Sequence, residues 1–137
     1  MGFLYEHKCA VEFEDMDQDG FVHHHKVACY FERAVFHAYK QQLGVLIREQ
    51  DYLIVLSTLF LRCIVPISEK HKPIVYLTIK SLGMVSIIWE AKIVSEGESR
   101  ILAQAEFKHG CINPVTSRPC KWPERISKRL SSYELET

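Results

Sequence analysis

A chain of 137 residues with 47% hydrophobic residues is long enough to bury one proper core, and we expect a single domain over residues 1–137. Its 17 Lys and Arg residues balance its 17 Asp and Glu residues, so no strong overall charge favours nucleic acid or an anionic membrane surface as a partner. The five cysteines include no CxxC pair and no close cysteine–histidine spacing of the kind that zinc sites use, which indicates a reduced compartment.

The N-terminal segment Met1–Lys8 has neither the basic start nor the long apolar stretch of a secretory leader. The most apolar stretch further along, Tyr52–Leu61, is too short to cross a bilayer and is followed at once by Arg62. We therefore expect a soluble, cytoplasmic protein with no membrane partner.

One strand and one long helix are predicted first along the chain. Tyr5–Glu14 alternates loosely between apolar and polar residues, which predicts a strand that ends in the acidic turn Asp15–Gly20. Apolar residues then recur at three- and four-residue steps from Val27 to Tyr39, and Gly44 is placed to close the helix. A stripe this wide predicts that the helix lies against a sheet.

The remaining chain supplies the rest of that sheet. Four segments rich in Val, Ile, Leu and aromatic residues are predicted strands: Tyr52–Ile67, Ile74–Lys80, Val85–Val94 and Ile101–Ile112. In the third, one face carries Ile87, Trp89, Ala91 and Ile93. Alternation of this kind predicts an antiparallel sheet of about five strands with one covered face.

Short turns connect the later strands, and prolines end them. Gly83 and Gly97 favour hairpins, so these strands are predicted to form a meander. Pro114, Pro119 and Pro123 then break strand geometry and leave a short basic, amphipathic tail at Arg125–Leu130. One long helix on an antiparallel sheet is an α+β arrangement, which is compatible with many functions.

The residues that carry chemistry are concentrated in the acidic turn, and calcium binding is the first interpretation of it. Asp15, Asp17, Asp19 and Gly20 match the opening of an EF-hand loop. The twelfth loop position is Lys26, however, where a bidentate glutamate closes an EF-hand, and a predicted strand stands where the entering helix belongs. The sequence therefore disfavours a calcium site.

A transition metal is the second interpretation, because His23, His24 and His25 follow the aspartates. Consecutive helical positions point about 100° apart, so at most one of the three imidazoles can share a pocket with Asp17. A solvated histidine-rich helix cap is favoured over a metal site, and we expect no metal and no other cofactor.

The third interpretation is a carboxylate beside a helix N-terminus, where free backbone N–H groups and the helix dipole stabilise developing negative charge. Such donors form an oxyanion hole. Aspartates before a helix are also common N-caps without any chemistry, and Asp19 is a candidate for that role. The residues alone favour the capping role and leave the catalytic one open.

The segment VEFEDMDQDGFVHHH at Val11–His25, followed by Tyr-Phe-Glu-Arg-Ala at Tyr30–Ala34, resembles the 4-hydroxybenzoyl-CoA thioesterase family, including acyl-CoA thioesterases of the Tol-Pal-associated type. The resemblance implies a hotdog fold, in which a curved antiparallel sheet wraps a long central helix. It further implies a homodimer or homotetramer in which subunits join their sheets and the active sites lie near the dimer interface.

The resemblance also implies roles for particular residues. Asp17 matches the catalytic carboxylate, acting as nucleophile or general base on an acyl-CoA or related acyl thioester, and Asp15 becomes a turn or capping residue. His24 matches the residue at the helix start whose backbone N–H points at the thioester carbonyl and whose ring helps orient the site. Glu32 matches an acidic position that faces the acyl pocket, with a helix-surface salt bridge as the alternative.

Three positions depart from the family pattern. Lys26 and Val27 stand where many members carry Asn and Tyr, and Met16 replaces a Thr or Cys between the two aspartates. These residues belong to the rim of the site, so they either shift the acyl specificity or mark a homologue that binds a thioester without hydrolysing it. The alternative function is therefore a non-catalytic hotdog module that binds an acyl thioester or an acyl-carrier protein.

Overall fold

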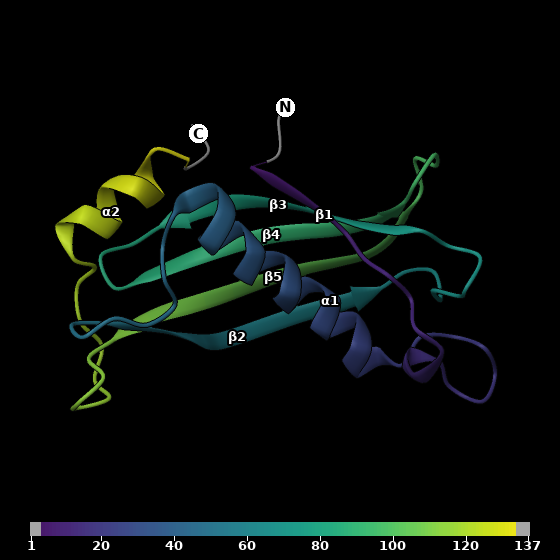
Figure 1. Ribbon diagram of the computed structural model, residues 1–137, viewed down its shortest axis with the longest axis horizontal. Helices are drawn as coiled ribbons and strands as arrows, with labels where there is room; N and C mark the ends of the chain where they lie inside the picture. Colours follow the sequence, from purple (N-terminus) through teal and green to yellow (C-terminus); the bar gives the residue numbers. More distant parts are fainter. Residues whose placement is uncertain (1–3, 134–137) are drawn as a thin grey trace.

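The structure is a computed structural model that describes residues 4–133. It contains one five-stranded antiparallel sheet that curves around a long helix (Figure 1). The strands are β1 (Tyr5–Lys8), β2 (Leu53–Cys63), β3 (Pro73–Leu82), β4 (Ser86–Ser95) and β5 (Ile101–Ile112). The helical segments are the 3-10 turn η1 (Phe13–Asp15), α1 (His24–His37), the π-helical turn η2 (Ala38–Leu43) and α2 (Glu124–Ser131).

The described chain contains no helix that is both long and apolar enough to cross a membrane. Of the N-terminal segment Met1–Lys8, the residues Met1–Phe3 lie outside the described part of the chain.

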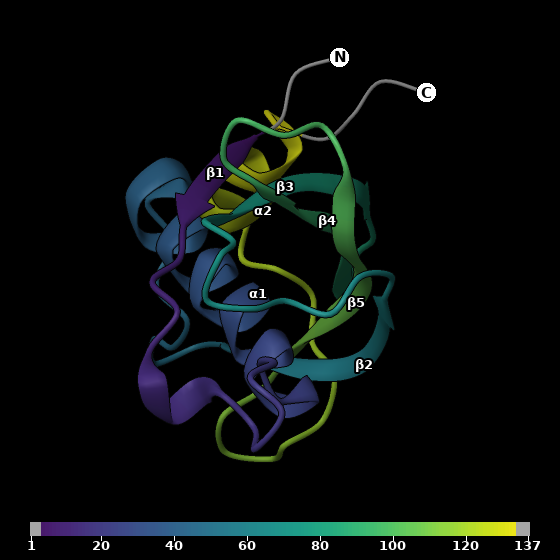
Figure 2. The ribbon, with the colours of Figure 1, turned by 90° about the vertical axis from the view of Figure 1, so that its right-hand side faces the viewer.

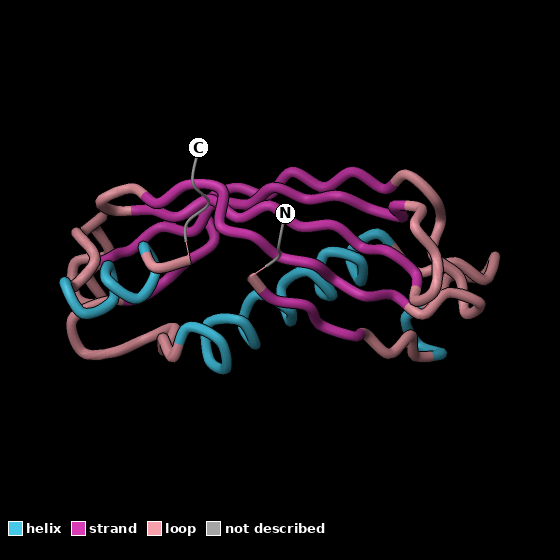
Figure 3. The backbone as a smooth tube through the Cα atoms, turned by 90° about the horizontal axis from the view of Figure 1, so that it is seen from above, coloured by secondary structure: helices cyan, strands magenta, loops and turns pink. Residues whose placement is uncertain are grey.

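The sheet has the strand order β1-β3-β4-β5-β2, and every neighbouring pair is antiparallel. Because β3, β4 and β5 follow one another directly, the predicted meander is confirmed. Gly97 lies in the β4–β5 turn with a φ of 80°, a left-handed conformation that favours glycine. The helix α1 lies along one face of the sheet (Figures 2 and 3), so the other face points outward. In the strand order, β2 is an edge strand.

The predicted apolar stripe of the helix is buried against the sheet. Its members are Val27, Tyr30, Phe31, Ala34, Val35, Ala38 and Tyr39. On the sheet, Ile87, Trp89 and Ile93 of β4 are fully buried, which confirms the predicted covered face. Burial of each large apolar side chain contributes about 1.5–3 kcal/mol, so this contact, more than helix propensity, holds the helix in place.

The helix ends where the sequence predicts. The turn η2 continues α1, and Gly44 follows it with a φ of 66°. Its backbone N–H donates to the Tyr39 carbonyl, which satisfies one of the free carbonyls at the helix end. The αL conformation explains why glycine occupies this position.

The first strand is shorter than predicted. Pairing with β3 stops at Lys8, which lies opposite Ile74, and the chain then leaves the sheet. Reciprocal bonds between Glu12 and Asp15 form a capping box that winds the following residues into η1. The loose alternation up to Glu14 therefore continued beyond the real strand end.

The strand β2 also ends early, at Cys63, although apolar residues continue to Ile67. The N–H groups of Ile64 and Val65 both donate to the Leu102 carbonyl, at 2.9 and 3.0 Å. Two donors on one acceptor end the regular ladder, and Pro66 follows directly.

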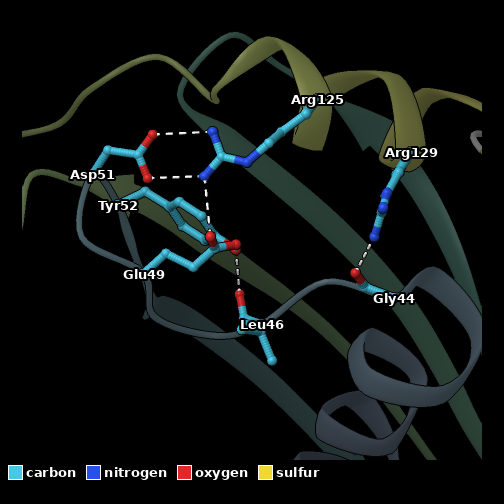
Figure 4. Close-up of polar contacts among 7 residues, drawn as sticks. All are labelled: Gly44, Leu46, Glu49, Asp51, Tyr52, Arg125 and Arg129. Atoms are coloured by element: carbon cyan, nitrogen blue, oxygen red, sulfur yellow. Dashed lines mark hydrogen bonds and ion pairs between the residues drawn. The ribbon is translucent and has the colours of Figure 1, made fainter.

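The basic, amphipathic tail predicted at Arg125–Leu130 forms a helix, α2, which docks over the loop that follows Gly44. Arg125 donates to both carboxylate oxygens of Asp51, at 3.0 and 3.1 Å, and to Glu49 at 3.2 Å (Figure 4). Arg129 donates to the Gly44 carbonyl. Leu130 of the same helix is fully buried. Both a buried apolar side chain and charged hydrogen bonds therefore attach α2 to the rest of the domain.

The buried Leu130 side chain should contribute more to the stability of this docking than the ion pairs of Arg125. We expect Leu130→Ala to lower the free energy of unfolding by about 2–5 kcal/mol, because it leaves a cavity in the core. Arg125→Ala should cost much less, because its side chain is half exposed and its ion pairs are screened by water. Urea denaturation of both variants measures their free energies of unfolding. A larger loss for Arg125→Ala than for Leu130→Ala would show that the ion pairs, and not the buried leucine, hold α2 in place.

Candidate functional site

The acidic turn is a tight loop that places Asp17 next to the start of α1. The Asp17 N–H donates to the Phe21 carbonyl at 2.6 Å, and the Gly20 N–H donates to the Asp17 carbonyl at 3.1 Å. An antiparallel bridge between Met16 and Val22 closes the loop at its base. Gly20 has a φ of 84°, which the turn requires and which glycine adopts without strain.

The Asp17 carboxylate is held by backbone donors. Its Oδ1 atom accepts from the N–H groups of Asp19, at 2.8 Å, and Phe21, at 3.0 Å. The hydrogen bond from Phe21 is the main cause that holds the pKa of Asp17 below its ordinary value, against a smaller opposing effect of burial. The group is therefore ionised at neutral pH, and because both bonds go to Oδ1, Oδ2 is the oxygen available for chemistry.

The start of α1 has no side-chain cap. The N-cap residue is His23, whose carbonyl accepts from the N–H groups of Lys26 and Val27 at 2.9 and 3.1 Å. The N–H groups of His24 and His25 have no acceptor within residues 4–133. The capping role proposed for Asp19 is wrong, since this residue lies in the exposed turn, and the helix start keeps free donors and its positive dipole end.

Asp17 and His24 meet in one pocket of about 310 Å³. Its walls are mainly apolar and include Val22, Val27 and the chain at 63–67 that follows β2. His23 and His25 do not line it, and their rings stack on each other with centroids 5.1 Å apart. The expectation that only one of the three histidines shares a pocket with Asp17 is confirmed.

Asp15 is a buried structural carboxylate. Its Oδ2 accepts from the Tyr30 hydroxyl at 2.9 Å and from the Glu12 N–H at 3.0 Å, and Lys26 lies 3.8 Å from its Oδ1. Burial raises its pKa, but these hydrogen bonds and the charges of Lys26 and Arg33 outweigh burial and hold the pKa below the ordinary value. The turn-and-cap role is confirmed, and Asp15 ties η1 to α1.

The same contact bears on the calcium interpretation. Lys26, at the position that closes an EF-hand, pairs with Asp15 at the first position of the loop. Among the described residues, no group of three or more His, Cys, Asp or Glu side chains is placed to hold a metal ion.

Glu32 lines a second cavity, of about 90 Å³, between α1 and the strands β2 and β5. It forms no ion pair within residues 4–133, so the salt-bridge alternative is not realised there. His109 lines the same cavity and is only 5% exposed. Sequence reasoning missed His109, although the alternation of β5 through Ala105 and Phe107 continues onto it.

His109 is linked to the helix and to the neighbouring strand. Its Nδ1 lies 2.7 Å from the Tyr39 hydroxyl, which also accepts from the Trp89 indole N–H at 3.0 Å. Burial lowers the pKa of His109 to about 4, so the imidazole is neutral at physiological pH.

A further hollow, of about 430 Å³, lies on the outer face of the sheet and is lined by polar and charged residues such as Arg62, Gln104 and Glu106. It contains neither Asp17 nor His24. The chemistry described above therefore belongs to the helix side of the sheet.

Comparison with known proteins identifies the family. A family model described as the thioesterase-like superfamily matches residues 11–130. The chain belongs to this superfamily. The match begins just before the acidic turn and ends within α2, so it covers Asp17, His24 and Glu32 alike. No curated protein matches the sequence significantly.

Solved structures show that this superfamily member has the hotdog-like fold. The PA5185 protein of Pseudomonas aeruginosa is 19% identical over 98% of this chain and 94% of its own, with a TM-score of 0.87. A thioesterase from Thermus thermophilus, complexed with coenzyme A and Zn, is 22% identical over 99% and 98%, with a TM-score of 0.83. A 1,4-dihydroxy-2-naphthoyl-CoA thioesterase from Synechocystis is 16% identical over 93% and 95%, with a TM-score of 0.84.

The structural role of Asp15 predicts a pH-dependent loss of stability. Because its folded-state pKa is lowered, Asp15 stabilises the fold above its unfolded pKa of about 4, and that contribution is lost as the pH falls through the folded value. We expect Asp15→Asn to cost about 1–3 kcal/mol at pH 7. The difference in free energy of unfolding between this variant and wild type should shrink below about pH 4.

Denaturation curves from pH 7 to pH 3 measure this gap. Glu14→Gln is the matched control, since it removes a neighbouring carboxylate that is exposed. A gap that stays constant over the whole pH range would show that the charge of Asp15 contributes nothing.

Proposed function

We propose that this superfamily member hydrolyses an acyl-CoA, or a related acyl thioester, to the free acid and the thiol. The observation that carries the proposal is the shared pocket of Asp17 and His24, which combines an ionised carboxylate with an uncapped helix N-terminus. Hydrolysis of a thioester needs a nucleophile or base, a donor for the developing oxyanion and an apolar space for the acyl group. All three elements are present on the helix side of the sheet.

Asp17 supplies the carboxylate by one of two routes. As a nucleophile, Oδ2 bonds to the carbonyl carbon, the C–S bond breaks with release of the thiolate, and water then hydrolyses the mixed anhydride. As a general base, Asp17 takes a proton from the attacking water. A pKa below the ordinary value keeps the carboxylate ionised at neutral pH, which both routes require.

The start of α1 supplies the oxyanion donor. The backbone N–H of His24 has no acceptor within residues 4–133 and lies at the positive end of the helix dipole, and His24 borders the pocket of Asp17. One well-placed donor of this kind contributes about 3 kcal/mol to the transition state.

The relatives support the substrate class. The Thermus protein contains coenzyme A, and the Synechocystis protein is named for an aryl-CoA substrate. We include in the proposal that, within the superfamily, this chain belongs with the 4-hydroxybenzoyl-CoA thioesterases and their Tol-Pal-associated type, which its sequence motif resembles.

We also propose that two copies join their sheets through β2. Apart from a bridge between Leu53 and Arg48 at its start, this eleven-residue strand pairs only with β5 in the described chain, so the rest of its other edge is free. It exposes Leu56, Leu59 and Phe60, the last by 79%. A long apolar edge strand favours pairing with another strand.

Asp17→Asn tests the carboxylate. Asparagine keeps an oxygen for the turn donors but removes the charge, so we expect the fold to persist while acyl-CoA hydrolysis falls to the uncatalysed background. A thiol-release assay measures the loss, and Asp19→Asn, in the same exposed turn, is the control. Because the pKa of Asp17 is lowered, wild-type kcat/KM should not fall through its protonation until the pH drops below about 4.

Unchanged turnover by Asp17→Asn would rule out this mechanism. Saturable acyl-CoA binding by wild type without any thiol release would instead favour the non-catalytic binding module.

Two substitutions of His24 separate its ring from its N–H group. His24→Ala removes the ring and keeps the donor, whereas His24→Pro also removes the donor. Proline is tolerated at the first helical position, and His23 has φ −56° and ψ 143°, which a following proline accepts.

We expect His24→Pro to lose about 100- to 1000-fold in kcat relative to His24→Ala, as for the loss of one oxyanion donor. Melting temperatures check that both variants fold. Equal kcat values for the two would exclude the His24 N–H as the oxyanion donor.

A further inference from the structure

The cavity beside Glu32 has an apolar lining with two polar groups. Apolar walls come from Phe31 and Val35 of α1 and from Leu59 of β2. Glu32 and His109 are the polar members, and among residues 4–133 the Cys29 thiol is the other ionisable group that lines the cavity. An imidazole that is 95% buried, as its 5% exposure implies, needs a defined hydrogen-bonding role.

The order of donors along Trp89, Tyr39 and His109 fixes the tautomer of the imidazole. An indole N–H only donates, so the Tyr39 oxygen accepts from Trp89 and keeps its own proton to give. His109 Nδ1, at 2.7 Å, is the acceptor for that proton. The reverse tautomer would leave the hydroxyl proton of the fully buried Tyr39 without a partner, which is unfavourable.

The remaining proton of the neutral ring is therefore on Nε2. This atom has no hydrogen-bond partner in the described chain. Every fully buried side-chain nitrogen or oxygen of residues 4–133 does have a partner. Nε2 is consequently not fully buried, and since His109 lines the cavity, Nε2–H is a donor available to what enters there.

The cavity lies along the same helix as the reacting groups. His24 and Val27 border the pocket of Asp17, and Ala28 and Glu32, one and two turns further on, border the cavity. The eight residue steps from His24 to Glu32 span about 12 Å of helix. The distance is in the range of a medium-length acyl chain, so the cavity is placed for the distal end of such a chain.

The polar lining narrows the group that fits. The cavity, of about 90 Å³, opens to the surface beside Glu32 and Leu59, both of which are exposed. A carboxylate at the end of the chain would face the negative charge of Glu32. An uncharged oxygen on a short aliphatic end matches both polar groups: it accepts from Nε2–H, and a hydroxyl can also donate to Glu32.

We propose that His109 is a specificity-determining residue that selects acyl chains carrying a hydroxyl or keto oxygen near their distal end. Trp89 and Tyr39 act as positioning residues that hold the imidazole in the donor tautomer. The inference rests on the proposed thioesterase function and adds to it the class of acyl group. A plain alkyl chain leaves Nε2–H without a partner, and a site built to donate discriminates strongly against it.

Matched pairs of acyl-CoAs test the inference. Each pair has the same chain length, of about four to ten carbons, and differs only in a hydroxyl on the penultimate carbon. At the preferred length we expect wild type to favour the hydroxylated member by about 10- to 100-fold in kcat/KM. His109→Phe, which removes the donor but keeps an apolar ring, should abolish the preference.

Tyr39→Phe provides the positioning test. It removes the partner of Nδ1, so nitrogen NMR of the imidazole should show a mixture of tautomers. The preference in kcat/KM for the hydroxylated acyl-CoA should then fall between those of wild type and His109→Phe. Equal kcat/KM values for both members of every pair in wild type, or a ratio unchanged in His109→Phe, would overturn the proposal.

A failure of the thioesterase function gives a different result. In that case no acyl-CoA releases thiol, and calorimetric binding of the same pairs still decides the role of His109. Tighter binding of the hydroxylated member by wild type, but not by His109→Phe, supports it, and equal binding overturns it.

Discussion

Burial of the apolar stripe of α1 against the curved sheet is the contact on which the other features depend. It fixes the axis of the helix, and therefore the position of its N-terminus relative to the strands. Tyr30, one of the buried residues, also donates to Asp15, so the same contact anchors the acidic turn. Asp17 and the free N–H of His24 are brought into one pocket by packing that has no catalytic role of its own.

The two aspartates of the turn show how neighbouring groups of one type acquire different roles. Asp15 is buried and has its oxygens taken by Tyr30, the Glu12 N–H and the nearby Lys26. Asp17 is partly exposed and has only one oxygen engaged, by backbone donors. Spacing along the chain makes them equivalent, and the fold distinguishes them by which side of the turn faces the core.

Periodicity predicted those features that depend on near neighbours in sequence. The stripe from Val27 to Tyr39, its end at Gly44 and the bounds of Ile101–Ile112 follow from local patterns, and all are confirmed. The strand ends at Lys8 and Cys63 were predicted too late, because pairing partners, not side-chain alternation, decide where a ladder stops.

The alternation of β5 indicates that His109 faces the core, but its hydrogen-bond partners could not be recognised from the sequence, since Tyr39 is 70 positions away and Trp89 belongs to another strand. The three side chains join the helix to two strands through a single line of hydrogen bonds, and such lines polarise one another. A ligand that bonds to Nε2 will therefore alter the electronic surroundings of the indole of Trp89. If a ligand bonds to Nε2 as proposed, we expect the fluorescence emission of Trp89 to change, so that binding can be followed without any added label.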